Sequence, residues 1–221
     1  MKHVIVSILG LSFFIEIHTG IALGRKATFP PEKQTITRIA FGSCLKQDAD
    51  LSVFPAIASK RPDLFVFGGD NVYADTTNEK ELISVYNRLG ESSEYKSFIQ
   101  TVPVIATWDD HDYGVNDGGA EHPTKEMAQR VFLDFFDEPI SSERRKRPGI
   151  YTSYQFGRAG KKLNIILLDT RYNRSKLIRR RAKNGDKYYE VSKGPDATIL
   201  GARQWQWLES EIVKPADLTI I

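Results

Sequence analysis

Three carboxylates lie within four residues, in the run Asp109-Asp110-His111-Asp112, directly after the apolar segment 102–108. Two ionised carboxylates ~4 Å apart repel each other by roughly 4 kcal/mol near a protein surface, so the cluster needs something that neutralises it. A bound cation would do so. The alternative is a solvated acidic turn in which His111 makes ordinary hydrogen bonds. The cluster alone leaves both interpretations open.

Two other apolar segments also lead into residue types that bind metals. Segment 64–67 is followed, across two glycines, by Asp70 and Tyr73, and the alternating segment 36–41 is followed by Cys44, the only cysteine in the sequence. Taken singly, Asp70 could cap a helix, Tyr73 could be a core aromatic and Cys44 could be a small buried thiol. Taken together, thiolate, phenolate and carboxylate suit trivalent iron better than zinc.

The elements that must position these residues alternate between strands and helices, which predicts an α/β fold. In such folds ligands bind at the carboxyl ends of the strands, where Cys44, Asp70, Asp110 and Asp169 all fall. Strands are expected at 36–41, 64–67, 102–108, 150–156, 163–168 and 218–221, and helices at 51–60, 79–89, 124–137 and 201–213.

Three local expectations accompany this assignment. Asn78 should cap the helix at 79–89, with Glu81 as its reciprocal partner. The helix at 201–213 should turn Trp205, Leu208 and Ile212 inward, and the basic segment 174–187 should be a loop or an excursion from the fold.

The first residues differ in composition from the rest of the chain. A basic start, a short apolar run to Ile17 and small residues at Gly20, Ala22 and Gly24 predict a secretory signal peptide over residues 1–24. The run is too short for a membrane span, which needs ~20 apolar residues, so no stable membrane insertion is expected after its removal. The mature chain, with its folded domain at 35–221, is expected to be secreted or periplasmic.

The ordered set of motifs resembles the alkaline phosphatase D (PhoD-like) branch of the metallophosphatases. The matching stretches span Phe41 to Leu208, which is most of the mature chain. They are Phe41-Gly42-Ser43-Cys44, Gly69-Asp70-Asn71-Val72-Tyr73, Trp108-Asp109-Asp110-His111-Asp112, Leu168-Asp169-Thr170-Arg171 and Leu200-Gly201-Ala202-Arg203-Gln204-Trp205-Gln206-Trp207-Leu208.

The resemblance implies a layered sandwich of mixed β-sheets flanked by helices and a site with two metals, iron(III) and a divalent ion such as calcium. Asp70 would bridge the ions, Cys44 and Tyr73 would ligate the iron, and Asp110 would ligate the second metal. His111 falls at the general-acid position. A metal-bound hydroxide would attack the phosphorus of a phosphate ester.

Arg171 is a further catalytic candidate, because its planar fork could clamp a phosphate oxygen. A structural pair with Asp169 is the alternative, and the roles of Asp109, Asp112 and Asp169 are not assigned by the sequence.

The family pattern continues past residue 221 with further metal ligands, so the sequence is expected to be the amino-terminal part of a catalytic domain, truncated at its carboxyl end. The leading hypothesis is an exported metal-dependent phosphoesterase that acts on a small phosphate ester. The alternative is a truncated, inactive relative with a binding or vestigial role. Nucleic acid is not expected as a dedicated partner, because the formal charge is only +3 and the arginine runs lack interleaved aromatics.

Overall fold

The computed structural model describes residues 29–190, 192 and 194–221. The expected signal peptide, residues 1–24, lies outside this range. Within the described range, no helix combines the length and the apolar character that a membrane crossing requires.

The first sheet is parallel and places β2 in its centre. Its order is β1-β2-β3, with Phe41 opposite Val66 and Val66 opposite Ile105. A central strand packs on both faces, which explains the apolar run Leu64–Phe67. The strands are β1 (Ile39–Gly42), β2 (Leu64–Gly68) and β3 (Val104–Thr107).

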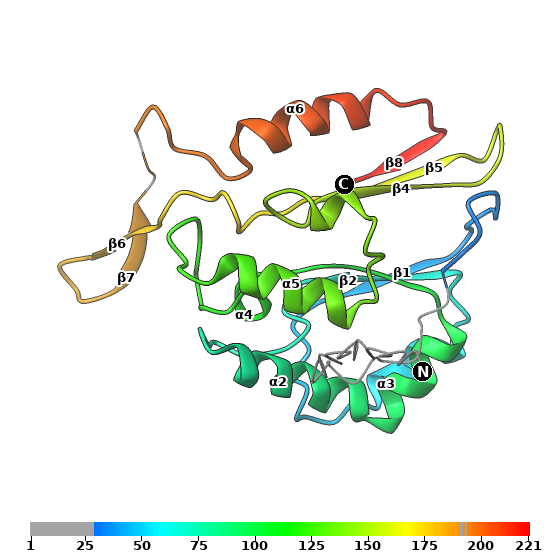
Figure 1. The fold of residues 1–221 in the computed structure, drawn as a ribbon, viewed down its shortest axis with the longest axis horizontal. Helices are drawn as coiled ribbons and strands as arrows, with labels where there is room; N and C mark the ends of the chain where they lie inside the picture. Colours follow the sequence, from blue (N-terminus) through cyan, green and yellow to red (C-terminus); the bar gives the residue numbers. More distant parts are fainter. Residues whose placement is uncertain (1–28, 191, 193) are drawn as a thin grey trace, which may run out of the picture.

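Helices cover one face of this sheet and bury an aromatic core against it (Figure 1). Phe54 lies 4.9 Å from Phe98 between ring centroids, and Phe65 contacts both Phe67 and Phe98 edge to face. The covering helices are α1 (Val53–Ser59), α2 (Glu79–Glu91), α3 (Ser93–Thr101) and α5 (Lys125–Phe135).

One of the two hydrogen bonds of the capping box that the sequence predicted at the start of α2 is present. The Asn78 side chain accepts a hydrogen bond from the Glu81 amide at 3.2 Å. The reciprocal bond was predicted wrongly, because the Glu81 carboxylate accepts from the Thr76 hydroxyl instead.

The second sheet packs on the opposite face of the first. In it, β4 (Thr152–Phe156) runs antiparallel to β5 (Leu163–Leu167), and β8 (Leu218–Ile220) runs parallel to β5. Apolar side chains fill the space between the sheets, and α6 (Gly201–Ile212) covers the outer face. The result is the expected layered sandwich, in the order helices, sheet, sheet, helix (Figure 1).

The inward face of α6 differs from the prediction. Leu208 is buried as expected, but Trp205 and Ile212 are each 49% exposed. Gln204 and Glu211 are buried in their place: the Gln204 amide bonds to the backbone of Asp169, and the Glu211 carboxylate accepts from a β4 serine. Polar contacts therefore set the rotation of this helix.

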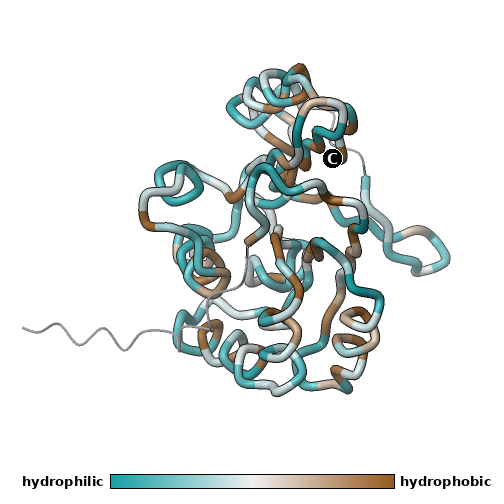
Figure 2. Tube along the Cα trace, turned by 90° about the vertical axis from the view of Figure 1, so that its right-hand side faces the viewer, coloured by the Kyte–Doolittle hydropathy of each residue, from teal (hydrophilic) through white to brown (hydrophobic). Residues whose placement is uncertain are grey.

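The basic segment is an excursion from the fold and not a loop, since it contributes to a hairpin of β6 (Ile178–Arg181) and β7 (Lys187–Glu190). Figure 2 shows this hairpin standing apart from the stacked layers and coloured mostly as hydrophilic.

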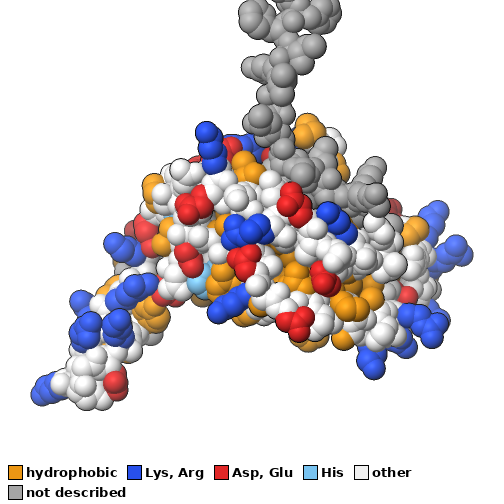
Figure 3. All heavy atoms as spheres, turned by 90° about the horizontal axis from the view of Figure 1, so that it is seen from below, with side chains coloured by type: hydrophobic (Ala, Val, Ile, Leu, Met, Phe, Trp, Pro, Cys, Tyr) orange, Lys and Arg blue, Asp and Glu red, His pale blue; other side chains and the backbone are white. Residues whose placement is uncertain are grey.

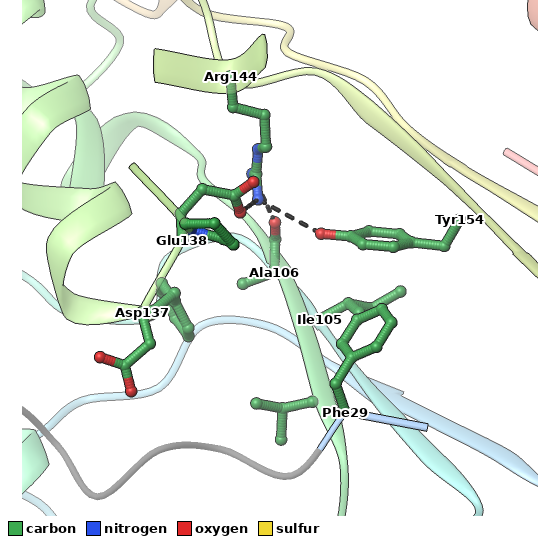
Figure 4. Close-up of a pocket in the computed structure, with 10 residues that line it drawn as sticks. Phe29, Ile105, Ala106, Asp137, Glu138, Arg144 and Tyr154 are labelled. Carbon is green, nitrogen blue, oxygen red and sulfur yellow. Dashed lines mark hydrogen bonds and ion pairs between the residues drawn. The ribbon is translucent and has the colours of Figure 1, made fainter. Parts of the chain in front are cut away.

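One buried cation, Arg144 in the short 3-10 helix Glu143–Arg145, ties the two sheets together at their edge. Its guanidinium donates to the carbonyl of Ala106 at 3.0 Å and pairs with Glu138 at 2.9 Å (Figure 4). It also donates to the carbonyl of Ile150 at 2.7 Å. The Tyr154 hydroxyl, on the second sheet, also accepts from Arg144 at 3.4 Å. Tyr154, Arg144, Ala106 and Glu138 line a cavity of about 370 Å³. The cavity flanks β3 itself rather than the turn that follows it.

Replacing Arg144 with Met should lower the free energy of unfolding by about 3–5 kcal/mol, because Glu138 and two buried carbonyls lose their partner. Lys146→Met is the matched control, since its ion pair with Glu143 is exposed and should contribute less than about 1 kcal/mol. Urea denaturation of both variants measures the difference, and equal losses would contradict the structural role of Arg144.

Candidate metal centre

The turns after β1 and β2 bring Cys44, Asp70 and Tyr73 together. The Cys44 amide donates to the carbonyl of Gly69 at 3.2 Å, which fixes one turn on the other. The Cys44 thiol lies 3.6 Å and the Tyr73 hydroxyl 3.4 Å from the same Asp70 oxygen, Oδ2. The three side chains that the sequence proposed as iron ligands thus converge on one point.

The backbone at these turns adopts conformations that side chains rarely take. Cys44 and Asp70 have φ values of 60° and 51°, in the left-handed region that disfavours non-glycine residues. Between the strand and Asp70, Gly69 has a φ of 109°, and a Cβ there would lie 2.7 Å from the Cβ of Asp109. Glycine is therefore required where the two strand ends approach.

The turn after β3 supplies the opposing carboxylate. The single-turn helix α4 (Asp110–Tyr113) begins directly after this strand, and Asp110 and Asp70 are both buried. One ligand atom from each of Asp70, Asp110 and His111 lies within 4.8 Å of the others. The other three predicted metal ligands therefore all lie close to Asp70, and the ligand roles stay predictions.

The charges at this location are poorly balanced by protein groups. Burial, together with the neighbouring carboxylates of Asp110 and Asp109, raises the pKa of Asp70. Burial also works against the charged form of Asp110, but the Asp117 amide and the Arg171 guanidinium outweigh it and lower the pKa of Asp110. One carboxylate is thus held ionised beside another that resists ionisation, which is the situation that a bound cation relieves.

The phenol of Tyr73 fits the same interpretation. Burial, the Cys44 thiol and the Asp70 carboxylate raise its pKa to about 12. Without a cation the phenol stays neutral. A metal ion would favour its ionised form, so the donor set of thiol, phenol and carboxylate fits a trivalent ion.

Asp112 has a structural role that the sequence did not assign. It is completely buried and accepts hydrogen bonds from the amides of Asn71, Val72 and Asp109 at 2.7, 3.2 and 3.0 Å. Burial raises its pKa to about 7, against the effect of these three amides. This single side chain joins the turn after β2 to the turn after β3.

Asp109, Asp169 and Arg171 are also placed by the structure. Arg171 forms an ion pair with Asp109, not with the side chain of Asp169, and its Nη2 lies 3.9 Å from Asp110 Oδ1. Asp169 is buried and accepts from the amides of Ile150, Arg171 and Tyr172. Arg171 therefore lies beside the candidate metal centre, and Asp169 holds the backbone of Arg171 in place.

His111 is oriented by a residue that the sequence analysis missed. Its Nδ1 lies 2.8 Å from the Asp75 carboxylate, and its ring packs on Tyr73 with centroids 4.1 Å apart. Burial works against protonation, but Asp75 and the carboxylates of Asp70 and Asp110 prevail and raise the pKa of His111. Nothing in the sequence distinguishes Asp75 from other loop carboxylates except its position two residues after Tyr73.

A second missed residue is Asp117. Its amide donates to Asp110 Oδ2 at 2.6 Å, and its carboxylate accepts from Arg179 at 2.8 Å and from the Tyr189 hydroxyl. Because the arginine and the tyrosine belong to the β6–β7 hairpin, contacts of this type cannot be found by a search along the sequence.

The fold and the site together define an α/β protein with a candidate metal centre at the carboxyl ends of its parallel strands. The family model for PhoD-like phosphatases matches residues 84–217, and the chain belongs to this family. The earlier resemblance is thereby confirmed.

A solved structure entitled "Structure of PhoD" shares the fold, with a TM-score of 0.67 and 18% identity. The match covers 87% of this chain and 42% of that one, so the chain spans less than half the length of this structural relative. A search of curated proteins found no match.

Asp75→Asn should lower the pKa of the His111 ring, because the charge that favours its protonated form is lost. An NMR titration of the histidine ring protons in EDTA measures this. His122, whose pKa burial lowers, is the internal control and should not move. An unchanged His111 titration in the variant would contradict the proposed pairing.

Proposed function

We propose that the chain is a metal-dependent phosphoesterase that hydrolyses small phosphate esters. The observation that carries this proposal is the pair of buried carboxylates, Asp70 and Asp110, which face each other with His111 at the ends of adjacent parallel strands. Membership of the PhoD-like phosphatase family supports a phosphate ester as the substrate.

The donors divide into two groups that share Asp70. Cys44 and Tyr73 would hold iron(III) together with Asp70, and Asp110 would hold a divalent ion, for which we propose calcium. Such ions supply Lewis-acid stabilisation of the charge on phosphate and activate the attacking water.

His111 is proposed to donate a proton to the departing ester oxygen. Asp75 binds Nδ1, so the ring orientation is fixed and Nε2 is the nitrogen left for the substrate. The raised pKa of His111 keeps more of the ring protonated near neutral pH.

Arg171 is proposed to contact a non-reacting phosphate oxygen. Its Nε is held by Asp109, while Nη2 extends toward Asp110. A guanidinium anchored in this way can donate through its remaining N–H groups without losing its orientation.

Asp70→Asn should weaken calcium binding and iron retention by at least about tenfold, because the carboxylate shared by both ions loses its charge. Calorimetric titration with Ca²⁺ and the iron content of the purified chain measure these effects. Tyr73→Phe should lower iron content alone and remove the visible absorption of an iron(III)–phenolate bond. Asp134→Asn, on the surface of α5, is the control.

A further variant, at His111, addresses catalysis. With a chromogenic phosphodiester, His111→Ala should lower metal-dependent turnover by ~10²–10⁴, the usual contribution of a general acid. Metal binding by Asp70→Asn equal to that of the unaltered chain would overturn the proposed centre.

We also propose that the protein is exported, on the signal-like pattern of residues 1–24. Amino-terminal sequencing of the secreted protein should find that Met1 is absent, and recovery of material that starts at Met1 would contradict export.

A further inference from the structure

The β6–β7 hairpin holds the charge excess of the chain. Residues 178–190 contain five Lys or Arg and two Asp or Glu, an excess of three positive charges, which equals the formal net charge of the whole sequence. The other residues of the chain therefore carry equal numbers of positive and negative formal charges. Figure 3 shows Lys and Arg side chains gathered on the hairpin where it projects from the body of the molecule.

Pairing in the hairpin interleaves these cations with aromatic rings. Arg179 is opposite Tyr189, and Arg180 is opposite Tyr188, so each tyrosine shares a face with an arginine. Side chains alternate along a strand, so these two pairs lie on opposite faces, and the facing residues Arg181 and Lys187 share the face of Tyr189. The two tyrosine rings are 48% and 50% exposed. Along the sequence the arginine runs lack interleaved aromatics. The tyrosines lie beside the arginines only in the folded hairpin, which pairs residues eight to ten positions apart.

Asp117 connects the hairpin to the metal centre. Its carboxylate accepts from Arg179 and Tyr189 of the hairpin, and its amide donates to Asp110 at 2.6 Å. A molecule bound along the hairpin would therefore lie close in space to the proposed metal ligand Asp110, because Asp117 contacts both.

A groove of about 520 Å³ lies between the hairpin and the loop at 116–117. Arg181 and Lys187 are cross-strand neighbours that line it, and neither has a carboxylate partner among the described residues. Their charges are available to a ligand, whereas Arg179 and Arg180 are already paired with Asp117 and Glu190.

We propose that this groove binds a single-stranded polynucleotide. Its phosphates would pair with Arg181 and Lys187, and a base would stack on Tyr189, which lies on the same face of the hairpin. Cations that follow a backbone, alternating with exposed aromatic rings, are the chemistry that recognises single strands without sequence preference. If the proposed function holds, the bound strand is also a substrate. The substrates would then include phosphodiester chains as well as small esters.

Binding is tested with the full chain and a fluorescein-labelled oligothymidylate, by fluorescence anisotropy in EDTA over a series of salt concentrations. Arg181→Glu/Lys187→Glu should weaken binding by at least about tenfold and reduce the slope of log affinity against log salt by about 1.4, since two phosphate contacts are lost. The control is Lys161→Glu/Lys162→Glu, an equal charge change in the exposed β4–β5 turn, at the end of the molecule away from the hairpin (Figure 1).

The aromatic part has its own test. Tyr189→Ala should weaken binding by at least about fivefold, and Tyr189→Phe should restore it, because stacking needs the ring and not the hydroxyl. Tyr188→Ala, on the opposite face of the hairpin, is the matched control and should change the affinity little. Inorganic polyphosphate of equal charge should compete poorly. Equal competition by polyphosphate, or equal effects of the two charge reversals, would overturn the inference.

EDTA prevents metal-dependent turnover, so the binding measurement does not depend on whether the chain is a phosphoesterase. Binding without hydrolysis of any ester would count against the phosphoesterase proposal alone. Hydrolysis of small esters without oligothymidylate binding would overturn the polynucleotide site alone.

Discussion

The candidate centre depends on one buried carboxylate that belongs to neither proposed metal. Asp112 accepts amide hydrogen bonds from the turn after β2 and from the turn after β3, so neither turn can move independently of the other. Asp70 and Asp110 are held face to face by this link, in spite of their mutual repulsion. A buried acceptor with three amide partners is costly to disturb, which makes it an effective constraint on geometry.

The structure separates the contacts that stabilise the fold from those that shape the site. Apolar side chains and the Arg144 guanidinium join the two sheets, and their backbone is regular. At the strand ends the backbone of Cys44 and Asp70 is left-handed and the charges are unbalanced. Strain and repulsion of this kind persist only where the surrounding structure holds them, and they concentrate at functional sites.

The sequence predicted where six of the described strands lie along the chain and that residues at the strand ends would converge, because apolar runs followed by polar or glycine-rich turns are local signals and parallel strands share a carboxyl edge. It failed where distant partners decide the outcome. Gln204 and Glu211 turn α6 through contacts with Asp169 and β4, which no hydrophobic periodicity encodes. The pairing of His111 with Asp75 likewise depends on how the segment after β2 approaches α4, 36 residues further along the chain.

The position of β8 has a consequence for how the protein is made. The turn between β4 and β5 is bonded to the start of β8 across a sequence separation of 55 residues, so β5 leaves the ribosome well before its parallel neighbour exists. During that interval a strand whose five residues are all buried in the folded protein has one open edge, which invites pairing with another chain. Pairing of β5 with β8 therefore competes kinetically with aggregation. Slower synthesis lengthens the interval before β8 is available and so favours pairing with another chain.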